Sequence, residues 1–187
     1  MIPKPPFPLF LWDRNLLLQI FATRRQEIRS TTLKSPLGLN AEEKTLQGFI
    51  NRFSSEIADN ARLTLEAMRK MFPGATALVY DNYNALVVGF SSTEKPSDGF
   101  ISLVVHPARI NLFFFSGASL IDPQHLLEGT GKKGRHMRIQ GKSDLERPEV
   151  RRLISEQVKR AKPWPKDRQS ELVIKSISKN QRPRRVD

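Results

Sequence analysis

The chain has 187 residues, of which 39% are hydrophobic and 27% charged, and it contains no cysteine. This composition is that of a folded protein long enough to bury a core, which excludes the disordered and fibrous classes. Without cysteine the chain has no disulfides, thiolate metal sites or cysteine nucleophiles, and we expect a cytoplasmic protein.

Positive charge is concentrated in the C-terminal third of the chain, although the net charge of +12 belongs to the whole. Residues 1–131 hold 13 basic and 12 acidic side chains, whereas residues 132–187 hold 18 basic and 7 acidic ones. A polarised basic surface attracts anions such as nucleic acid, acidic lipid or phosphorylated metabolites. The alternative is that the basic tail only keeps the domain soluble.

Residues 1–40 form a separate N-terminal extension. Asp13 and Arg14 divide its apolar stretch into two patches, and neither reaches the ~20 residues of a membrane span. Lys4 is the only early cation and prolines crowd the apolar run, unlike a secretory signal. We therefore predict neither a signal nor a membrane anchor. An alternative is that residues 1–38 arise from a start codon placed too far upstream.

Helix and strand periodicities then follow in order. Apolar residues recur every three or four positions from Leu46 to Phe72, which predicts one continuous helix over residues 41–72. Asn40 and Glu43 form a capping-box pattern at its start. After Ala75 the period changes to two. Residues 75–91 predict two strands joined through the turn 81–84, and residues 100–117 predict two more that reverse at 106–109.

The remaining segments complete a sandwich. Residues 122–129 carry the signature of a short helix, with Asp122 as N-cap and Pro123 at the first helical position. Residues 135–140 alternate as a fifth strand, and residues 147–161 predict a C-terminal helix. We therefore expect an α+β domain over residues 41–162: a two-layer sandwich with a mostly antiparallel sheet of about five strands, packed by the long N-terminal helix and the C-terminal helix. Residues 163–187 form a basic linker, a segment compatible with an edge strand, and a tail.

The stretch from Gly117 to His136 resembles the YdhG-like family, a domain of unknown function. The residues that carry the resemblance are Gly117, Leu120, Asp122, Pro123, Leu126, Leu127, Glu128, Gly129, Gly131, Lys132, Arg135 and His136. The match covers roughly residues 50–162. It implies a small two-layer α/β domain and supplies no catalytic residues. One branch of the family is described as a frataxin-like iron chaperone, so the resemblance alone raises iron as a cofactor.

The glycine-rich stretch Leu126–Ile139 is the first candidate site. It is not a P-loop, because it follows a predicted helix and precedes a strand, the reverse of the order that aims helix N–H groups at a phosphate. Its glycines could still form an anion nest, or they could only shape a turn. We predict an anion-binding surface from the basic residues in and around the stretch. Its members are Arg109, Lys132, Lys133, Arg135, His136, Arg151 and Arg152.

Metal and catalytic sites receive no assignment from the sequence. His106, His125 and His136 lie on three different predicted elements without ligand spacing. No motif pairs a nucleophile with a base, and a turn explains Tyr80 and Asp81 as well as a cleft does.

The function predicted from the sequence is binding without catalysis. The partner is nucleic acid or a phosphorylated small molecule, and nothing in the sequence indicates an oligomeric state. An iron-binding chaperone is the alternative and an unrecognised enzyme the third reading. The tail arginines at 182, 184 and 185 favour sequence-independent nucleic-acid binding, and Trp164 could stack on a base or simply pack on the domain.

Overall fold

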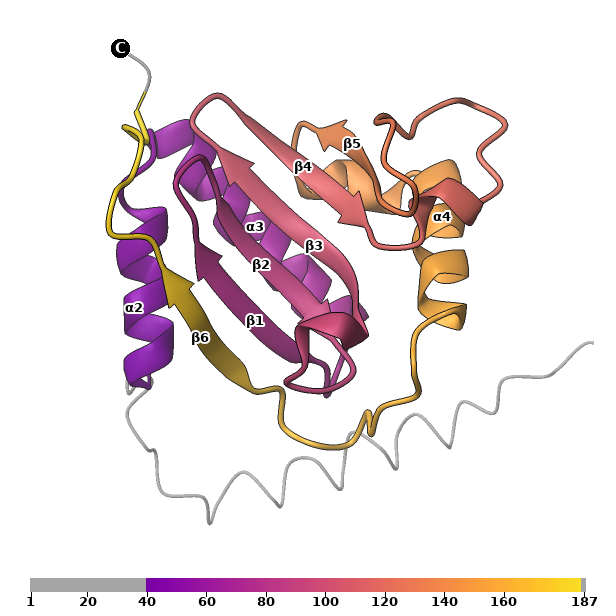
Figure 1. Ribbon diagram of the computed structural model, residues 1–187, viewed down its shortest axis with the longest axis horizontal. Coiled ribbons are helices and arrows are strands. Elements are labelled where there is room, and N and C mark those ends of the chain that lie inside the picture. Colours follow the sequence, from indigo (N-terminus) through magenta and orange to yellow (C-terminus); the bar gives the residue numbers. More distant parts are fainter. Residues whose placement is uncertain (1–39, 186–187) are drawn as a thin grey trace, which may run out of the picture. The chain divides into compact units, whose positions relative to one another are not determined.

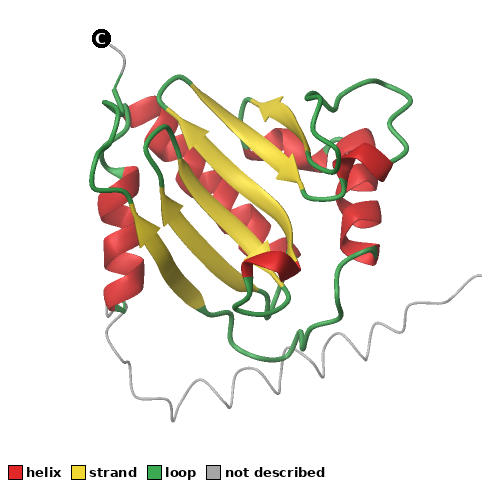
Figure 2. Ribbon diagram, in the orientation of Figure 1, coloured by secondary structure: helices red, strands yellow, loops and turns green. Residues whose placement is uncertain are grey.

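A six-stranded sheet and three α-helices make up the α+β domain in the computed structural model, which describes residues 40–185 (Figures 1 and 2). The helices are α2 (Ala41–Ile50), α3 (Ser55–Met71) and α4 (Pro148–Lys159). The strands are β1 (Thr76–Asp81), β2 (Leu86–Ser91), β3 (Gly99–His106), β4 (Arg109–Phe114), β5 (Arg135–Ile139) and β6 (Leu172–Ile177). The predictions about residues 1–38, and nearly all of the extension 1–40, lie outside the described residues.

The sheet order is β5-β4-β3-β2-β1-β6. Strands β1 to β5 pair antiparallel along this order, and β6 alone pairs in parallel, against β1. The predicted α+β class and mostly antiparallel sheet are confirmed. The sixth strand is the segment that the sequence marked as compatible with an edge strand, so Leu172–Ile177 joins the same sheet as the predicted domain.

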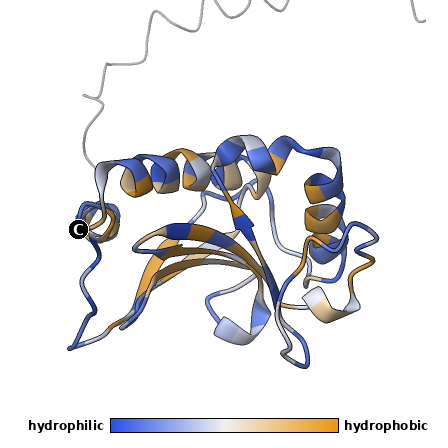
Figure 3. Cartoon of the chain, turned by 90° about the horizontal axis from the view of Figure 1, so that it is seen from above, coloured by the Kyte–Doolittle hydropathy of each residue, from blue (hydrophilic) through white to orange (hydrophobic). Residues whose placement is uncertain are grey.

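All three helices lie on one face of the sheet (Figure 3). Strand side chains alternate between the two faces, so every second residue points at the helices. One such row crosses five strands through Val79, Val88, Leu103, Leu112 and Met137, each almost completely buried. The apolar stripe of α3 packs on these rows, which places the hydrophobic core between the sheet and the helices.

The continuous helix predicted over residues 41–72 is instead two helices. Helix α2 ends at Ile50, and α3 begins at Ser55 with Ser54 as its N-cap. Phe53 lies in the connection and is still buried in the core. A spacing of three and four therefore continues across the break, which is why the apolar pattern alone predicted one helix. The predicted cap at Asn40 is confirmed, since its side chain accepts a 2.8 Å hydrogen bond from the Glu43 N–H.

The short helix predicted over residues 122–129 does not form. The Asp122 side chain accepts a hydrogen bond from the Leu127 N–H at 2.7 Å, five residues ahead, and so closes a turn instead of capping a helix. His125 has a left-handed backbone with φ of 53°. That conformation is incompatible with a right-handed helix at this position.

The linker from α4 to β6 is fixed to the domain at several points, among them Trp164, Lys162 and Arg168, whose guanidinium donates to the Gly74 carbonyl at 2.6 Å. The Trp164 ring stacks on Phe100 with 4.9 Å between ring centroids, and its indole N–H donates to the Pro73 carbonyl at 2.9 Å. Nearby, the Lys162 ammonium lies 2.6 Å from Asp98 and lowers the pKa of that carboxyl. Trp164 therefore packs on the domain, as the second of its two predicted roles stated.

Candidate anion-binding site

The glycine-rich stretch ahead of β5 is a tightly packed turn. The Arg135 guanidinium donates to the backbone carbonyls of Gly131 and Gly134, the latter at 2.8 Å. A Cβ added at Gly134 would lie 2.3 Å from the Phe113 ring, so only glycine fits there without movement. Carbonyl oxygens directed at a guanidinium satisfy the cation locally. The Arg135 guanidinium is therefore already hydrogen-bonded to the backbone of its own turn and is less available to an anion.

The predicted basic residues do not meet at one point. Arg109 pairs with His106 at one end of β4, whereas Arg135 pairs with Phe114 at the other end, about 17 Å away at the usual rise per residue. His136 lies on β5, 3.7 Å from the Glu128 carboxylate. Lys132 and Lys133 are exposed in the turn. Arg109 is thus separated from the glycine-rich turn, which lies within the family-like motif.

Arg151 and Arg152 lie on α4, away from the sheet end that carries Arg109. Both side chains are exposed. Arg151 borders a groove of about 570 Å³ whose lining includes Ile154, Val158 and Trp164. The seven predicted residues therefore occupy three places in the domain: the β3–β4 turn, the glycine-rich turn with β5, and α4.

A buried carboxylate stands at the opposite edge of the meander from the glycine-rich turn. Asp81, at the end of β1, is 1% exposed and faces the helix layer, because it lies two residues after the core residue Val79. It accepts from Arg52 at 3.0 Å and from Arg184 at 2.8 Å, and the Gln181 amide also donates to it. A buried ion is tolerated only when its oxygens are paired in this way. The cluster therefore holds the C-terminal tail, which supplies two of the three donors.

The tail runs back along the turn between β1 and β2. The Ser178 N–H donates to the Asp81 carbonyl at 2.8 Å, and the Arg182 N–H donates to the Tyr83 carbonyl at 3.0 Å. Arg184 is 5% exposed, donates to the Asn82 carbonyl, and lies 5.5 Å from the centre of the Phe53 ring. Its burial fixes the positions of its neighbours, because Arg182 and Arg185 flank it in the chain.

Arg182 and Arg185 line one pocket together with Arg109. The pocket has a volume of about 680 Å³. It lies between the tail and the turns at the ends of the β1–β2 and β3–β4 hairpins, and its lining is Asn84, His106, Pro107, Ala108, Arg109, Arg182, Pro183 and Arg185. None of these residues is acidic, and within residues 40–185 none of the three arginines forms an ion pair. The pocket therefore gathers three guanidinium groups and an imidazole around open space.

The pKa of His106 is lowered in this pocket, first by burial and then by the positive charge nearby. Burial lowers the pKa from its ordinary value of 6.5, and the charge of Arg109 lowers it further. A backbone hydrogen bond at Asn84 opposes the shift, while His136 and Arg184 add smaller contributions that lower it. Burial therefore favours the neutral imidazole, and the charge of Arg109, which forms no ion pair within residues 40–185, acts in the same direction.

The histidines do not assemble a metal centre. In the described part of the chain, no group of three or more His, Asp or Glu side chains is placed to hold a metal ion. His106 lines the pocket, His125 lies in the turn after Asp122, and His136 contacts Glu128.

The sequence did not predict that the tail arginines would line a pocket with Arg109. Arg109 was among the predicted residues, and the tail arginines were recognised as basic without a position. The available signal was Asp81, which is the only carboxylate in the six strands and ends an otherwise apolar strand. Such a residue requires a buried cation, and the arginine-rich tail offers one.

Comparison with known proteins adds no relative. No family model, curated protein or solved structure matches the chain. The resemblance to the YdhG-like family therefore stays a prediction from the sequence. Among the residues described, no helix combines the length and the hydrophobicity needed to cross a membrane.

Proposed function

We propose that the protein binds a phosphate-bearing anion, without catalysis, in the pocket lined by Arg109, Arg182 and Arg185. The observation that carries the proposal is the lining itself: three arginines and a histidine surround about 680 Å³ with no carboxylate among them. Like charges gathered without a counter-ion favour binding an anion, because an anion relieves their repulsion. Arginine also offers paired N–H groups that match phosphate oxygens.

The anchored tail supports a pocket built for this purpose. Arg184 is buried against Asp81. This contact holds the nearby Arg182 and Arg185 at the pocket, and neither of them forms an ion pair within residues 40–185. Solubility requires only exposed charge, whereas this buried contact fixes the tail beside the pocket. The proposed site therefore combines a basic tail with the turn of one hairpin, and it moves the predicted anion site away from Lys132 and Lys133.

Calorimetry with inorganic sulfate at low ionic strength tests the proposal. Sulfate is a tetrahedral dianion like phosphate. We expect saturable binding to the full chain, and about a hundredfold weaker affinity in the double variant Arg182→Gln, Arg185→Gln, since each charged hydrogen bond contributes roughly 1.5–3 kcal/mol.

The matched control is Arg151→Gln with Arg152→Gln, which removes the same charge from α4. Its sulfate affinity should stay within about twofold of the wild type, because these exposed side chains do not line the pocket and act on the anion only weakly through water. If both double variants lost the same sulfate affinity, net charge alone would explain the binding, and the pocket would be rejected as the site. A loss confined to Lys132→Ala, Lys133→Ala would place the site in the glycine-rich turn.

A further inference from the structure

The face of the sheet opposite the helices carries no covering element over its centre. A Cβ added at Gly89, in the middle of β2, would come within 4 Å of only the Ser102 hydroxyl and the Leu78 carbonyl. Both belong to the adjoining strands. No helix or loop of residues 40–185 comes within 4 Å of this point, consistent with the one-sided helix layer in Figure 3. The residues around it are nevertheless closely packed, since Leu78, Ser102 and Asn111 on the same face are 2%, 2% and 5% exposed.

Flat side chains stand on this open face. One row crosses the sheet from Tyr80 through Val87, Val104 and Asn111 to Arg138. The next row runs from Leu78 through Gly89 and Ser102 to Phe113 and His136. Tyr80, Phe113 and His136 are all partly exposed. Because Tyr80 and Phe113 are three strands and one row apart, the two positions are separated by about 16 Å.

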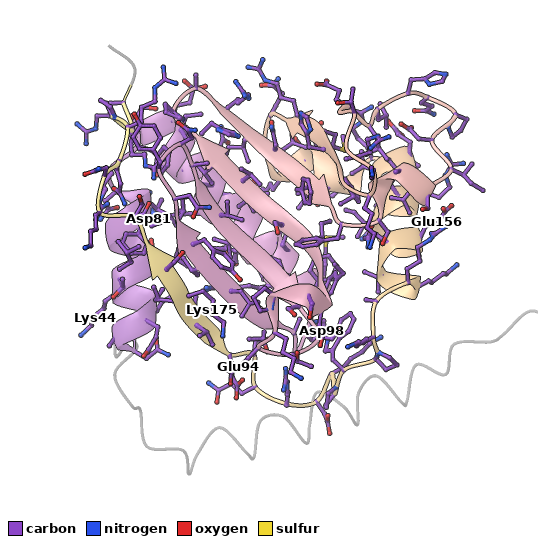
Figure 4. All side chains as sticks on the ribbon, viewed as in Figure 1. Lys44, Asp81, Glu94, Asp98, Glu156 and Lys175 are labelled. Carbon is purple, nitrogen blue, oxygen red and sulfur yellow. The ribbon has the colours of Figure 1, made fainter. Side chains whose placement is uncertain are left out.

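The charge of the strands is almost entirely positive. The six strands contain one carboxylate, Asp81, which faces the helices and is neutralised there. On the open side, Arg138 stands in the Tyr80 row and His136 in the Phe113 row. The cation Lys175 on β6 lies 3.7 Å from Glu94, and Figure 4 shows the two side by side at the far edge. Excess positive charge therefore lies toward β4, β5 and the pocket.

We infer that the open face binds single-stranded nucleic acid, with bases stacked on Tyr80 and Phe113 and a backbone phosphate in the pocket. This inference rests on the proposed function, which supplies the phosphate. Base stacking on exposed rings combined with a cationic groove is the general mode of single-strand recognition. A duplex hides the flat faces of its bases, so it cannot use these rings.

Fluorescence anisotropy with the full chain tests the inference. The probes are a labelled oligothymidylate of about 15 nucleotides and a base-free phosphodeoxyribose chain of equal length. We expect the oligothymidylate to bind at least about tenfold more tightly than the base-free chain, because stacking contributes that much per base. Tyr80→Leu should remove about tenfold, while Tyr80→Phe should bind as the wild type does.

Two further measurements make the outcomes decisive. Both Tyr80 variants should bind sulfate as the wild type does and melt close to its temperature, because Tyr80 does not line the pocket. If sulfate binds but the base-free chain equals the oligothymidylate, the open face has no role and the proposed function survives. If sulfate fails to bind, both proposals fall. Equal or tighter binding of duplex DNA or of polyglutamate would also overturn the single-strand assignment.

Discussion

Arg184 and Arg185 are neighbours in the chain with opposite environments. Arg184 is 5% exposed and lies 2.8 Å from the buried Asp81 carboxylate, whereas Arg185 is exposed and borders the pocket. Removing one partner of a buried ion pair leaves an uncompensated charge, which is far more costly than removing a surface charge. The two residues therefore separate a structural arginine from a ligand-facing one.

Replacing Arg184 with glutamine should destabilise the fold. We expect the free energy of unfolding to fall by about 3 kcal/mol, because the Asp81 carboxylate stays buried with one donor fewer. Urea denaturation of the full chain measures this change. The control Arg185→Gln should lie within about 0.5 kcal/mol of the wild type. Equal stability of the two variants would show that Arg184 does not hold the tail.

His106 gives the pocket a pH dependence. Burial and the charge of Arg109 lower its pKa, so in the free protein the imidazole stays neutral to a lower pH than an ordinary histidine does. A bound anion favours the protonated form and raises the pKa. Protons are therefore taken up on binding, and affinity must rise as pH falls through the pKa of the complex and level off below that of the free protein.

Sulfate affinity should accordingly increase between pH 7.5 and pH 5.5, by up to about tenfold if the two pKa values differ by one unit. Sulfate is the appropriate probe because phosphate titrates in the same range. Calorimetry at constant ionic strength measures the profile. The variant His106→Gln should flatten it, and an unchanged slope in that variant would assign the titration to another group.

At the scale of elements, the turn before β5 is shaped by close packing. Gly134 lies against the Phe113 ring, and Arg135 fills the space beside Gly117. The turn thereby joins the last meander strand to β5, and a motif that suggested a phosphate loop has a structural explanation. Gly131 has more room, since an added Cβ would meet only the Gly134 carbonyl at 3.4 Å.

Gly134→Ala should therefore destabilise the protein by about 1–3 kcal/mol, the usual cost of overpacking. Thermal unfolding followed by circular dichroism measures the loss. Gly131→Ala is the matched control and should change stability by less than about 1 kcal/mol. If both alanine variants unfolded like the wild type, the tight contact at Phe113 would not constrain the turn.

At the scale of the molecule, the domain gathers charge from distant parts of the chain. Arg109 follows β3, while Arg182 and Arg185 arrive more than 70 residues later, after β6 has paired with β1. Binding to single-stranded nucleic acid should thus depend on salt through counterion release. The number of phosphates neutralised sets the steepness of that dependence.

The double variant Arg182→Gln, Arg185→Gln should reduce the slope of log affinity against log salt by about 0.7, the contribution of the one phosphate that the pocket neutralises. Anisotropy titrations at salt concentrations from about 50 to about 200 mM measure this slope. Arg151→Gln with Arg152→Gln should leave the slope unchanged. If the slope decreased equally in that control, the nucleic-acid interface would extend onto α4.

Local signals were enough for most of the elements. Period-two runs predicted the strands of the meander, and Pro148 with the apolar spacing after it predicted α4, because these patterns depend on neighbours a few residues away. The break at Ser54 and the turn after Asp122 were missed for a related reason. Apolar spacing does not record whether the backbone is continuous, and Asp can close a turn as well as cap a helix.

The sequence by itself determined the α+β class, the two periodicities and the basic C-terminal third. Only the tertiary structure decided which of those cations stand together. Arg109 and the tail arginines form one pocket because β6 pairs beside β1 and Asp81 buries Arg184. Arg135 is closer to Arg109 in sequence, but its guanidinium donates to the carbonyls of its own turn instead. Strand pairing and burial act between residues far apart in the chain, and no local pattern encodes those distances.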